Sequence, residues 1–297
     1  MTITAYPSPQ VAAEDLFTAE LYPHQYSELI QTALQEDLSR GGDLTSQALI
    51  PSTHESQLFI CAREPGVLAG SAIASAVFAQ LDPQVAVDFQ CQDGAQIETG
   101  EVLARIQGPT RSILAAERTA LNFLGHLSGI ATATADLCAR ARPYASKITC
   151  TRKTLPGLRA LQKYAVRVGG GHNHRMALDD AVLIKDNHIA LAGGIAQALD
   201  RARRAVGHMV ALEIEVDNLE QLDEALAHGA QIILLDNMDP STLAAAVQKC
   251  AGRAITEASG GITPERINEI AAAGVDYISV GWLTHSANNL DLGLDVL

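Results

Sequence analysis

The sequence of 297 residues contains few aromatic residues and few cysteines. Only 4% of the residues are Phe, Trp or Tyr although 47% are hydrophobic, so the apolar residues are mainly Ala, Leu, Ile and Val. This composition is typical of helices packed over β-branched strands. The five cysteines stand far apart without a C-x-x-C pair, which excludes a disulfide framework and a cysteine-rich zinc site as expectations.

Positive charge is absent from the first 39 residues, which removes the charged start of a signal or transit peptide. The longest apolar run, residues 68–81, is shorter than the roughly 20 residues that span a bilayer. We therefore expect a cytoplasmic protein with no membrane partner.

Acidic residues outnumber basic ones overall, giving a formal net charge of −13, yet the basic residues gather in one stretch. Residues 140–185 hold ten Lys or Arg against two Asp, a local charge of +8. Extended nucleic-acid binding needs a broad basic face, so no nucleic-acid partner is expected. One basic island in an acidic chain instead predicts a pocket for a small anion.

The first half of the chain predicts a mixed α/β domain. "PHQYSELIQTALQEDL", residues 23–38, has the apolar spacing of an amphipathic helix, and residues 70–81 predict a second helix. "DGAQIETGEVLARIQG", residues 93–108, alternates apolar and polar positions between glycine-bearing turns and predicts a β-hairpin. A long helix over residues 112–141 is expected to link this domain to the next one.

The second half repeats an apolar strand, a short polar loop and an Ala/Leu-rich helix. Strands are expected near 148–152, 181–186, 210–216, 231–236, 254–258 and 277–281, with helices near 195–206, 218–228, 241–251 and 264–273. No glycine-rich dinucleotide fingerprint follows the first strand, so an α/β barrel is favoured over a Rossmann sheet. Barrels gather their chemistry at the carboxyl ends of strands. The residues at these ends are charged or small: Arg152, Lys153, Lys185, Glu213, Glu215, Asp236, Glu257, Ser259 and Gly281.

Several cations of the basic stretch are candidate ligand-binding residues. Arg152, Arg175 and Lys185 could converge on a carboxylate-rich ligand, because Arg offers two-point contacts and Lys a compact charge. His174 could donate a hydrogen bond to the ligand or act in proton transfer. The alternative, a solvated charged face, is weakened by the three glycines at 169–171 and by the shortage of acids nearby.

Other basic residues receive a structural interpretation. Arg159, Lys163 and Arg167 follow helical spacing, which predicts one solvated helix face. His172 and His188 are interpreted as structural. The nine histidines include no H-E-x-x-H pattern, so a zinc site is not expected.

Two acids end successive predicted strands. Glu215 and Asp236, placed opposite the cations, suit Mg²⁺ held through water beside a diphosphate. The alternative is a pair of acids stabilised by the N-terminal ends of the helices that follow.

"EASGGITPER", residues 257–266, predicts a phosphate site. Here a strand gives way to Ser259, Gly260 and Gly261, and Thr263 then precedes a proline as the predicted N-cap of a helix. Free backbone N–H groups at such a turn suit a phosphate, and Gly281 follows on the next strand. The alternative is an ordinary tight turn.

The motifs taken together resemble the quinolinate phosphoribosyltransferase family, the carboxylating nicotinate-nucleotide pyrophosphorylases of NAD biosynthesis. The resemblance covers most of the chain and rests on "QEDLSRGGDLTS", "ERTALNFLGHLSGIAT", "TRKTLPGLR", "GGGHNHRMALDDAVLIKDNH", "EIEV", "LLDN" and "EASGGI". It implies an α/β sandwich domain over residues 1–125, with 285–297 packing back on it. It also implies an incomplete, open α/β barrel of the type II phosphoribosyltransferase kind over residues 126–284. The family's "TRKT" box is commonly followed by Thr, and Leu155 here is interpreted as a packing change.

The resemblance also implies substrates and residue roles. Quinolinate would contact Arg152, His174, Arg175 and Lys185, with Arg118 entering from the second subunit of a homodimer. Lys153, Glu215 and Asp236 would serve the diphosphate and Mg²⁺ end of phosphoribosyl pyrophosphate, with Lys153, Lys185, Glu215 and Asp236 as the catalytic set. Its 5-phosphate would lie on Ser259, Gly260, Gly261 and Gly281. The products would be nicotinate mononucleotide, diphosphate and CO₂.

Three alternatives stay open at this stage. A relative of the same fold is associated with molybdenum transport, although "NHR" and "KDNH" favour the quinolinate enzyme. A Schiff-base aldolase could use Lys185, because a lysine at a barrel strand end suits that chemistry. A non-catalytic sensor of phosphorylated ligands would bind phosphoribosyl pyrophosphate without turnover.

Overall fold

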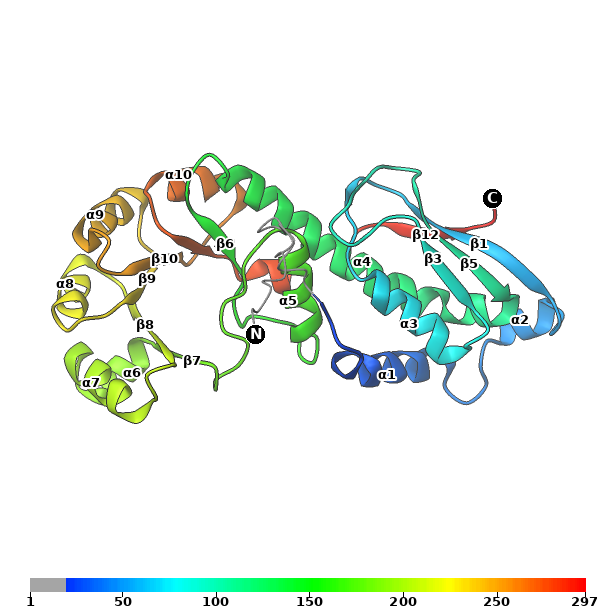
Figure 1. Ribbon diagram of the computed structural model, residues 1–297, viewed down its shortest axis with the longest axis horizontal. Coiled ribbons are helices and arrows are strands. Elements are labelled where there is room, and N and C mark those ends of the chain that lie inside the picture. Colours follow the sequence, from blue (N-terminus) through cyan, green and yellow to red (C-terminus); the bar gives the residue numbers. More distant parts are fainter. Residues whose placement is uncertain (1–19) are drawn as a thin grey trace, which may run out of the picture.

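The computed structural model describes residues 20–297, which form two units joined by the long helix α4 (Thr110–Ala141) (Figure 1). The helix spans 32 residues and agrees with the predicted linking helix. The predicted domain boundary at 125/126 falls inside α4, so this helix belongs to both units. The first 19 residues of the predicted N-terminal domain lie outside the described residues.

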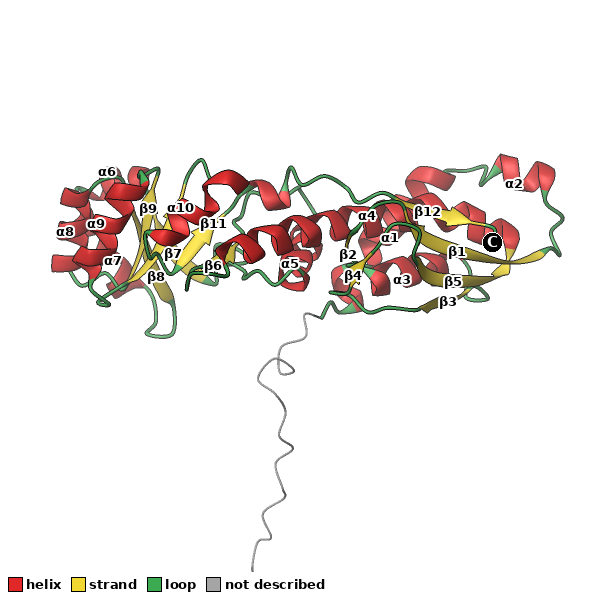
Figure 2. Ribbon diagram, turned by 90° about the horizontal axis from the view of Figure 1, so that it is seen from above, coloured by secondary structure: helices red, strands yellow, loops and turns green. Residues whose placement is uncertain are grey.

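The N-terminal unit packs helices on an antiparallel sheet (Figure 2). Its helices are η2 (Pro23–Gln25), α1 (Ser27–Leu38), α2 (Leu44–Leu49) and α3 (Ser71–Leu81). Its strands are β1 (Glu55–Ala62), β2 (Gly66–Val67), β3 (Ala86–Phe89), β4 (Gln96–Ile97), β5 (Val102–Pro109) and β12 (Leu292–Asp295). The main sheet has the order β12-β1-β5-β3, so the end of the chain returns to pair with β1. Helices α1, α3 and α4 pack on one another beside this sheet.

The predicted hairpin over residues 93–108 is wrong. β4 pairs with β2, whereas β5 pairs with β1 on one side and β3 on the other. A turn does form between β4 and β5, but its backbone bonds run to Ala62, since the N–H of Gly100 donates to the carbonyl of Ala62. Both edges of β5 are already occupied, so β4 cannot add to it.

The second unit is a six-stranded parallel sheet covered by helices. Its strands are β6 (Lys147–Thr149), β7 (Ala181–Ile184), β8 (Ala211–Val216), β9 (Ile232–Asp236), β10 (Ile255–Ser259) and β11 (Tyr277–Ser279). Its helices are α5 (Arg159–Val168), α6 (Asp186–Ala192), α7 (Ile195–Ala205), α8 (Leu219–Ala227), α9 (Pro240–Cys250), η3 (Pro264–Arg266), α10 (Ile267–Ala272) and η4 (Trp282–Thr284). The six strands agree with the predicted ones to within a few residues.

The sheet order β6-β11-β10-β9-β8-β7 leaves β6 and β7 as two edges, so the barrel is open. His172 makes a parallel bridge to Thr149 at the free edge of β6, and Ala181 begins β7 at the other edge. The irregular residues 173–180 therefore connect the two edges of the open sheet.

Local sequence explains why strands and helices alternate here. Strand interiors such as Ile214, Ile233 and Leu235 are fully buried, as expected for a parallel sheet covered by helices. Asn218 and Asp239 then cap α8 and α9 by accepting hydrogen bonds from backbone N–H groups of the first turn. The polar residues between strand and cap consequently lie together at the carboxyl edge of the sheet. Within residues 20–297, no helix combines the length and the apolar character needed to cross a membrane.

Candidate active site

A cavity of about 530 Å³ opens at the carboxyl ends of the parallel strands. It contains ten of the twelve site residues expected from the sequence. These ten are Arg152, Lys153, His174, Arg175, Lys185, Glu215, Asp236, Ser259, Gly260 and Gly261. The structure thus brings together residues that are up to 109 positions apart in the chain.

The two guanidinium groups in the cavity are arranged to receive an anion. The Nε atoms of Arg152 and Arg175 are buried and lack a hydrogen-bond partner, although Arg175 Nη1 donates to the Ala181 carbonyl at 2.9 Å. Burial and the neighbouring Arg152 charge lower the pKa of Arg175, so the pair is held together against repulsion. A ligand with carboxylates would supply the missing acceptors and relieve that repulsion.

The acidic side of the cavity holds Lys185 and the ends of two adjacent strands. Lys185 Nζ lies 2.5 Å from Glu215 Oε2, with the carboxylate largely buried and the lysine half exposed. Asp236 Oδ2 accepts a hydrogen bond of 2.6 Å from the neighbouring Asn237 side chain. Each carboxylate is thus oriented by one protein donor, which leaves its other oxygen for a ligand.

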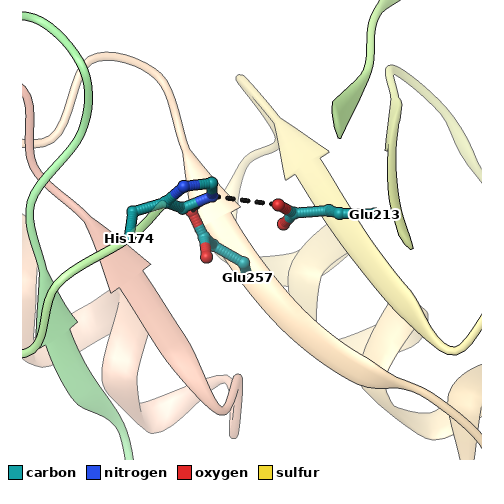
Figure 3. A group of neighbouring side chains, drawn as sticks. All are labelled: His174, Glu213 and Glu257. Atoms are coloured by element: carbon teal, nitrogen blue, oxygen red, sulfur yellow. Dashed lines mark hydrogen bonds and ion pairs between the residues drawn. The ribbon is translucent and has the colours of Figure 1, made fainter. Parts of the chain in front are cut away.

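A buried group of His174, Glu213 and Glu257 forms the floor of the site (Figure 3). His174 Nε2 lies 2.9 Å from Glu213 Oε2 and 3.7 Å from Glu257 Oε1, and its Nδ1 accepts the backbone N–H of Arg175 at 2.8 Å. Burial lowers the pKa of His174, but the hydrogen bond to Glu213 and the Glu257 charge outweigh it and raise the pKa overall. The backbone contact acts the other way, because an Nδ1 that accepts cannot carry a proton. Since the adjacent N–H cannot turn away, we assign the neutral ring with its hydrogen on Nε2.

The two glutamates of this group are crowded and incompletely satisfied. One carboxylate oxygen each of Glu213 and Glu257 is buried without a partner. Burial and the charge of Glu213 raise the pKa of Glu257 to about 7. Ligand atoms of the three residues lie within 4.8 Å of one another, a set that could hold a metal ion. Because the ring N–H of His174 already lies on Glu213, we interpret the set as a hydrogen-bonded group that stores a proton.

The predicted phosphate end is made by loop backbone. Gly260 and Gly261 have φ of +88° and +58°, and a Cβ on Gly260 would lie 2.1 Å from Asn237 Oδ1, so residue 260 must be glycine. The predicted helix start is shorter than expected: Thr263 makes no side-chain cap, and a three-residue 3₁₀ turn precedes α10. Support for a phosphate therefore comes from the glycine loop and Ser259, and a helix terminus adds none.

Two expected site residues lie outside the cavity lining. Gly281 stands behind Lys153, since a Cβ at Gly281 would lie 2.9 Å from Lys153 Cδ. Arg118 is exposed on α4, and no ion pair with Glu117 or another acid is formed within residues 20–297. Within one subunit, Arg118 is thus not brought to the other site residues.

The predicted solvated face of Arg159, Lys163 and Arg167 is wrong for its central member. Lys163 is fully buried, and its Nζ donates to the backbone carbonyls of His174 and Arg175 at 2.7 and 2.9 Å. The helix spacing was read correctly, but α5 packs against α4 on the face that carries Lys163. A charge run predicts a surface only when no buried acceptor faces it.

Sequence reasoning assigned no role to several cavity residues: Thr151, Leu183, Leu234, Asn237, Glu257 and Ser279. Glu213 was likewise noted only as a strand-end residue. A signal existed for the two glutamates, because Glu213 and Glu215 share one face of β8 and Glu257 stands level with Leu234 on the neighbouring strand. Their contact with His174 depends on the irregular segment 173–180, which no periodicity describes.

The fold and the cavity together define a phosphoribosyltransferase of the type II fold, with an N-terminal sheet unit attached to an open parallel barrel. Comparison with known proteins gives the particular family. Residues 43–128 match the model "Quinolinate phosphoribosyl transferase, N-terminal domain" and residues 130–295 match the corresponding C-terminal domain. The chain belongs to the quinolinate phosphoribosyltransferase family.

Individual relatives agree with this assignment. The chain is 48% identical over 275 residues to the nicotinate-nucleotide pyrophosphorylase [carboxylating] of Mycobacterium leprae, covering 90% of this chain and 95% of the relative. It is 44% identical over 272 residues to the probable enzyme of that name from Bacillus subtilis, covering 92% and 93%. The solved structure of NadC from Streptococcus pyogenes superposes with a TM-score of 0.91 at 40% identity, covering 94% of this chain and 98% of that one.

Proposed function

We propose that this protein transfers the phosphoribosyl group of phosphoribosyl pyrophosphate to quinolinate and decarboxylates the product. It thereby makes nicotinate mononucleotide, diphosphate and CO₂ for NAD biosynthesis. The observation that carries the proposal is the pair Arg152 and Arg175, whose buried Nε donors lack acceptors at the floor of a cavity. Quinolinate is a dianion with two adjacent carboxylates, which match paired guanidinium groups.

The residue roles divide the cavity between the two substrates. Arg152, Arg175 and Lys185 would bind the carboxylates of quinolinate, while His174 would contact the ring from the floor. Since the ring N–H of His174 already lies on Glu213, its main effect on the ligand would be to hold Glu213 and the Arg175 backbone in place.

The other end of the cavity suits phosphoribosyl pyrophosphate. Ser259, Gly260 and Gly261 would receive the 5-phosphate, with Gly281 leaving room for Lys153 to reach the diphosphate. The role of Lys153 is electrostatic: it would stabilise the negative charge that develops on the leaving diphosphate.

Glu215 and Asp236 fit a magnesium ion held through water. Both are hard oxygen donors at the ends of adjacent strands, and each has one oxygen free of a protein donor within the described residues. When bound, Mg²⁺ would neutralise part of the charge of the diphosphate. Lys185, paired with Glu215, would keep that carboxylate oriented before the ion arrives.

The chemistry then follows from positioning and charge. The ring nitrogen of quinolinate attacks ribose C1 as the bond from C1 to the diphosphate oxygen breaks, through an oxocarbenium-like state. The product is a pyridinium, an electron sink. The bond between C2 and its carboxylate can therefore break with release of CO₂, and the electron pair left on C2 takes up a proton.

A homodimer would complete each site. Arg118 is exposed on α4 and makes no ion pair within residues 20–297, so it is free to enter the cavity of a second copy. We also place the protein in the cytoplasm, because its five cysteines are all free thiols, three of them buried.

The aldolase alternative is disfavoured by the state of Lys185. Schiff-base chemistry needs a neutral amine, whereas Lys185 Nζ forms an ion pair with Glu215 in which it carries a proton. Borohydride reduction in the presence of a carbonyl substrate should therefore trap no adduct. The molybdenum-associated relative and the phosphate sensor are separated by turnover of quinolinate.

The direct test supplies quinolinate, phosphoribosyl pyrophosphate and Mg²⁺ to the purified protein. We expect CO₂ and nicotinate mononucleotide in equal amounts, and neither product when any one component is omitted. Product formation from nicotinate at a comparable kcat/KM would contradict the proposal, because cations placed for two carboxylates would then be unused.

A further inference from the structure

The segment that carries His174 and Arg175 lacks the hydrogen bonds of a strand. Residues 173–180 connect the two edges of the open sheet without regular structure. The carbonyls of His174, Arg175 and Met176 accept no backbone N–H within residues 20–297. Something else must fix these three peptide groups if the Arg175 side chain is to point reproducibly into the cavity.

Helix α5 supplies the missing donors from two basic residues one turn apart. Lys163 Nζ donates to the carbonyls of His174 and Arg175 at 2.7 and 2.9 Å, and Arg159 Nη1 donates to the carbonyl of Met176 at 3.2 Å. Three consecutive carbonyls are thus held by residues at i and i+4 of one helix face. We call Arg159 and Lys163 the carbonyl clamp.

The burial of Lys163 shows that the clamp opposes the general tendency of charged side chains to stay in water. Its side chain is fully buried, and no carboxylate lies within ion-pair distance of it among the described residues. Burial lowers the pKa of Lys163, in keeping with this cost. Burying an ammonium against neutral carbonyls is unfavourable unless those carbonyls must be held.

Helix α5 is itself well anchored. Its residues Leu161, Ala165 and Val166 are buried in the same apolar cluster as the N-terminal unit. The clamp therefore transmits the rigidity of that cluster to the irregular segment.

We infer that Lys163 is a positioning residue for quinolinate binding, acting through the backbone of His174 and Arg175 and without contact to the ligand. This inference rests on the proposed function. It assigns a purpose to a cation that composition alone would place on the surface.

The test measures quinolinate and phosphoribosyl pyrophosphate binding separately by calorimetry, in wild type and in Lys163→Met. We expect roughly ten- to a hundredfold weaker quinolinate binding, because a bond to an ammonium fixes the guanidinium contact. Binding of phosphoribosyl pyrophosphate should be unchanged, which also shows that the variant folds. Lys163→Gln, whose amide can still donate, should fall between the two, and Arg167→Met on the next turn of α5 should match wild type.

A double-mutant cycle separates positioning from general stability. If Lys163 acts through Arg175, then Lys163→Met combined with Arg175→Ala should bind quinolinate no more weakly than Arg175→Ala alone. Additive losses, equal losses for both ligands, or unchanged quinolinate binding in Lys163→Met would each overturn the inference.

Hydrogen exchange tests the clamp without any ligand. Backbone amides of residues 173–180 should exchange faster in Lys163→Met than in wild type, while those of β8 and β9 should not. If wild type itself binds no quinolinate, the proposed function fails, but the exchange result still supports or contradicts the clamp.

Discussion

The two units of the molecule differ in what they bury. Every charged side chain that is buried within residues 20–297 lies in the barrel half: Lys163, Glu213, Glu215 and Glu257. The N-terminal part, residues 20–125, buries apolar side chains and only three hydroxyl residues. Apolar burial favours folding, whereas buried charge opposes it. The comparison teaches that the first unit supplies stability and that the second unit gives up some stability to hold a reactive cavity.

The two units are nevertheless not independent. Helix α4 contributes Leu124 and Leu127 to the first apolar cluster and Leu137 and Ala141 to the second. Helix α5 follows β6 of the barrel in sequence but packs into the first cluster. Damage to the first core should therefore also reach the segment that the clamp holds.

The largest expected effect concerns the dimer, where one unit would complete the site of another copy. Arg118→Ala and Arg175→Ala should each be nearly inactive, because every site in either homodimer lacks one arginine. After unfolding and joint reassembly, about half of the dimers should be mixed, and roughly a quarter of all sites should be intact. The measurement is specific activity after refolding, with refolded wild type as control. A mixture as inactive as its parents, beside a control that recovers, would show that Arg118 does not act across an interface.

The next effect falls on the N-terminal core. Phe78 is almost fully buried, and Phe78→Ala should lower the free energy of unfolding by about 3–5 kcal/mol while both ligand affinities stay unchanged. Far-UV circular dichroism follows the whole chain, whereas fluorescence of the single Trp282 follows the barrel, where its ring N–H donates to Ile262. Because α4 joins both cores, the two signals should shift together in urea. Separate transitions would show that the units unfold independently.

The same comparison explains what the sequence could predict. The barrel strands were placed correctly because buried parallel strands are continuous apolar runs that end in polar residues. Ten cavity residues were found for the same reason, since the carboxyl ends of parallel strands share one edge. In the N-terminal unit, two-residue strands such as β2 and β4 carry too little pattern to reveal their partners.

The remaining differences come from contacts between distant segments. The burial of Lys163 follows from the packing of α5 on α4 and from three carbonyls that lack partners, which no charge count reveals. The grouping of Glu213 and Glu257 around His174 requires the position of an irregular segment. Arg118 lies outside the cavity of its own subunit, so its role stays a prediction from the resemblance.

Within the cavity, the two substrate ends should be separable. Arg175→Ala should weaken quinolinate binding by on the order of 2–3 kcal/mol, since it removes a two-point contact, and should leave phosphoribosyl pyrophosphate binding nearly unchanged. Lys153→Ala should do the reverse. Calorimetry on both variants with both ligands checks this division, and equal losses for both ligands in both variants would refute it.

A smaller effect depends on pH. Glu257 has a folded-state pKa of about 7, raised from 4.5, so the folded protein binds more protons than the unfolded chain between those values. This carboxyl therefore costs no stability below about pH 4.5 and destabilises the fold increasingly as pH rises through 7. Relative to Glu257→Gln, wild type should lose a few degrees of Tm between pH 5 and pH 8. Parallel Tm profiles of the two proteins would show that Glu257 is ionised throughout.

The smallest effect is expected at Leu155, which occupies the position where the family commonly has Thr. Its side chain is 38% exposed, and its backbone N–H donates to Gln162 Oε1 at 3.0 Å. Leu155→Thr keeps that backbone bond and removes only partly exposed apolar surface. The free energy of unfolding should therefore change by no more than about 0.5 kcal/mol, with kcat/KM unchanged.

The matched contrast is Gln162→Ala, because Gln162 is fully buried and also contacts His126 Nε2 at 2.9 Å through its amide. Its removal leaves the Leu155 N–H and the His126 ring without their partner, so it should cost about 1–3 kcal/mol. Urea unfolding and steady-state kinetics on the two variants decide the matter. If Leu155→Thr changed kcat/KM as strongly as Gln162→Ala, residue 155 would belong to the site and the packing interpretation would be wrong.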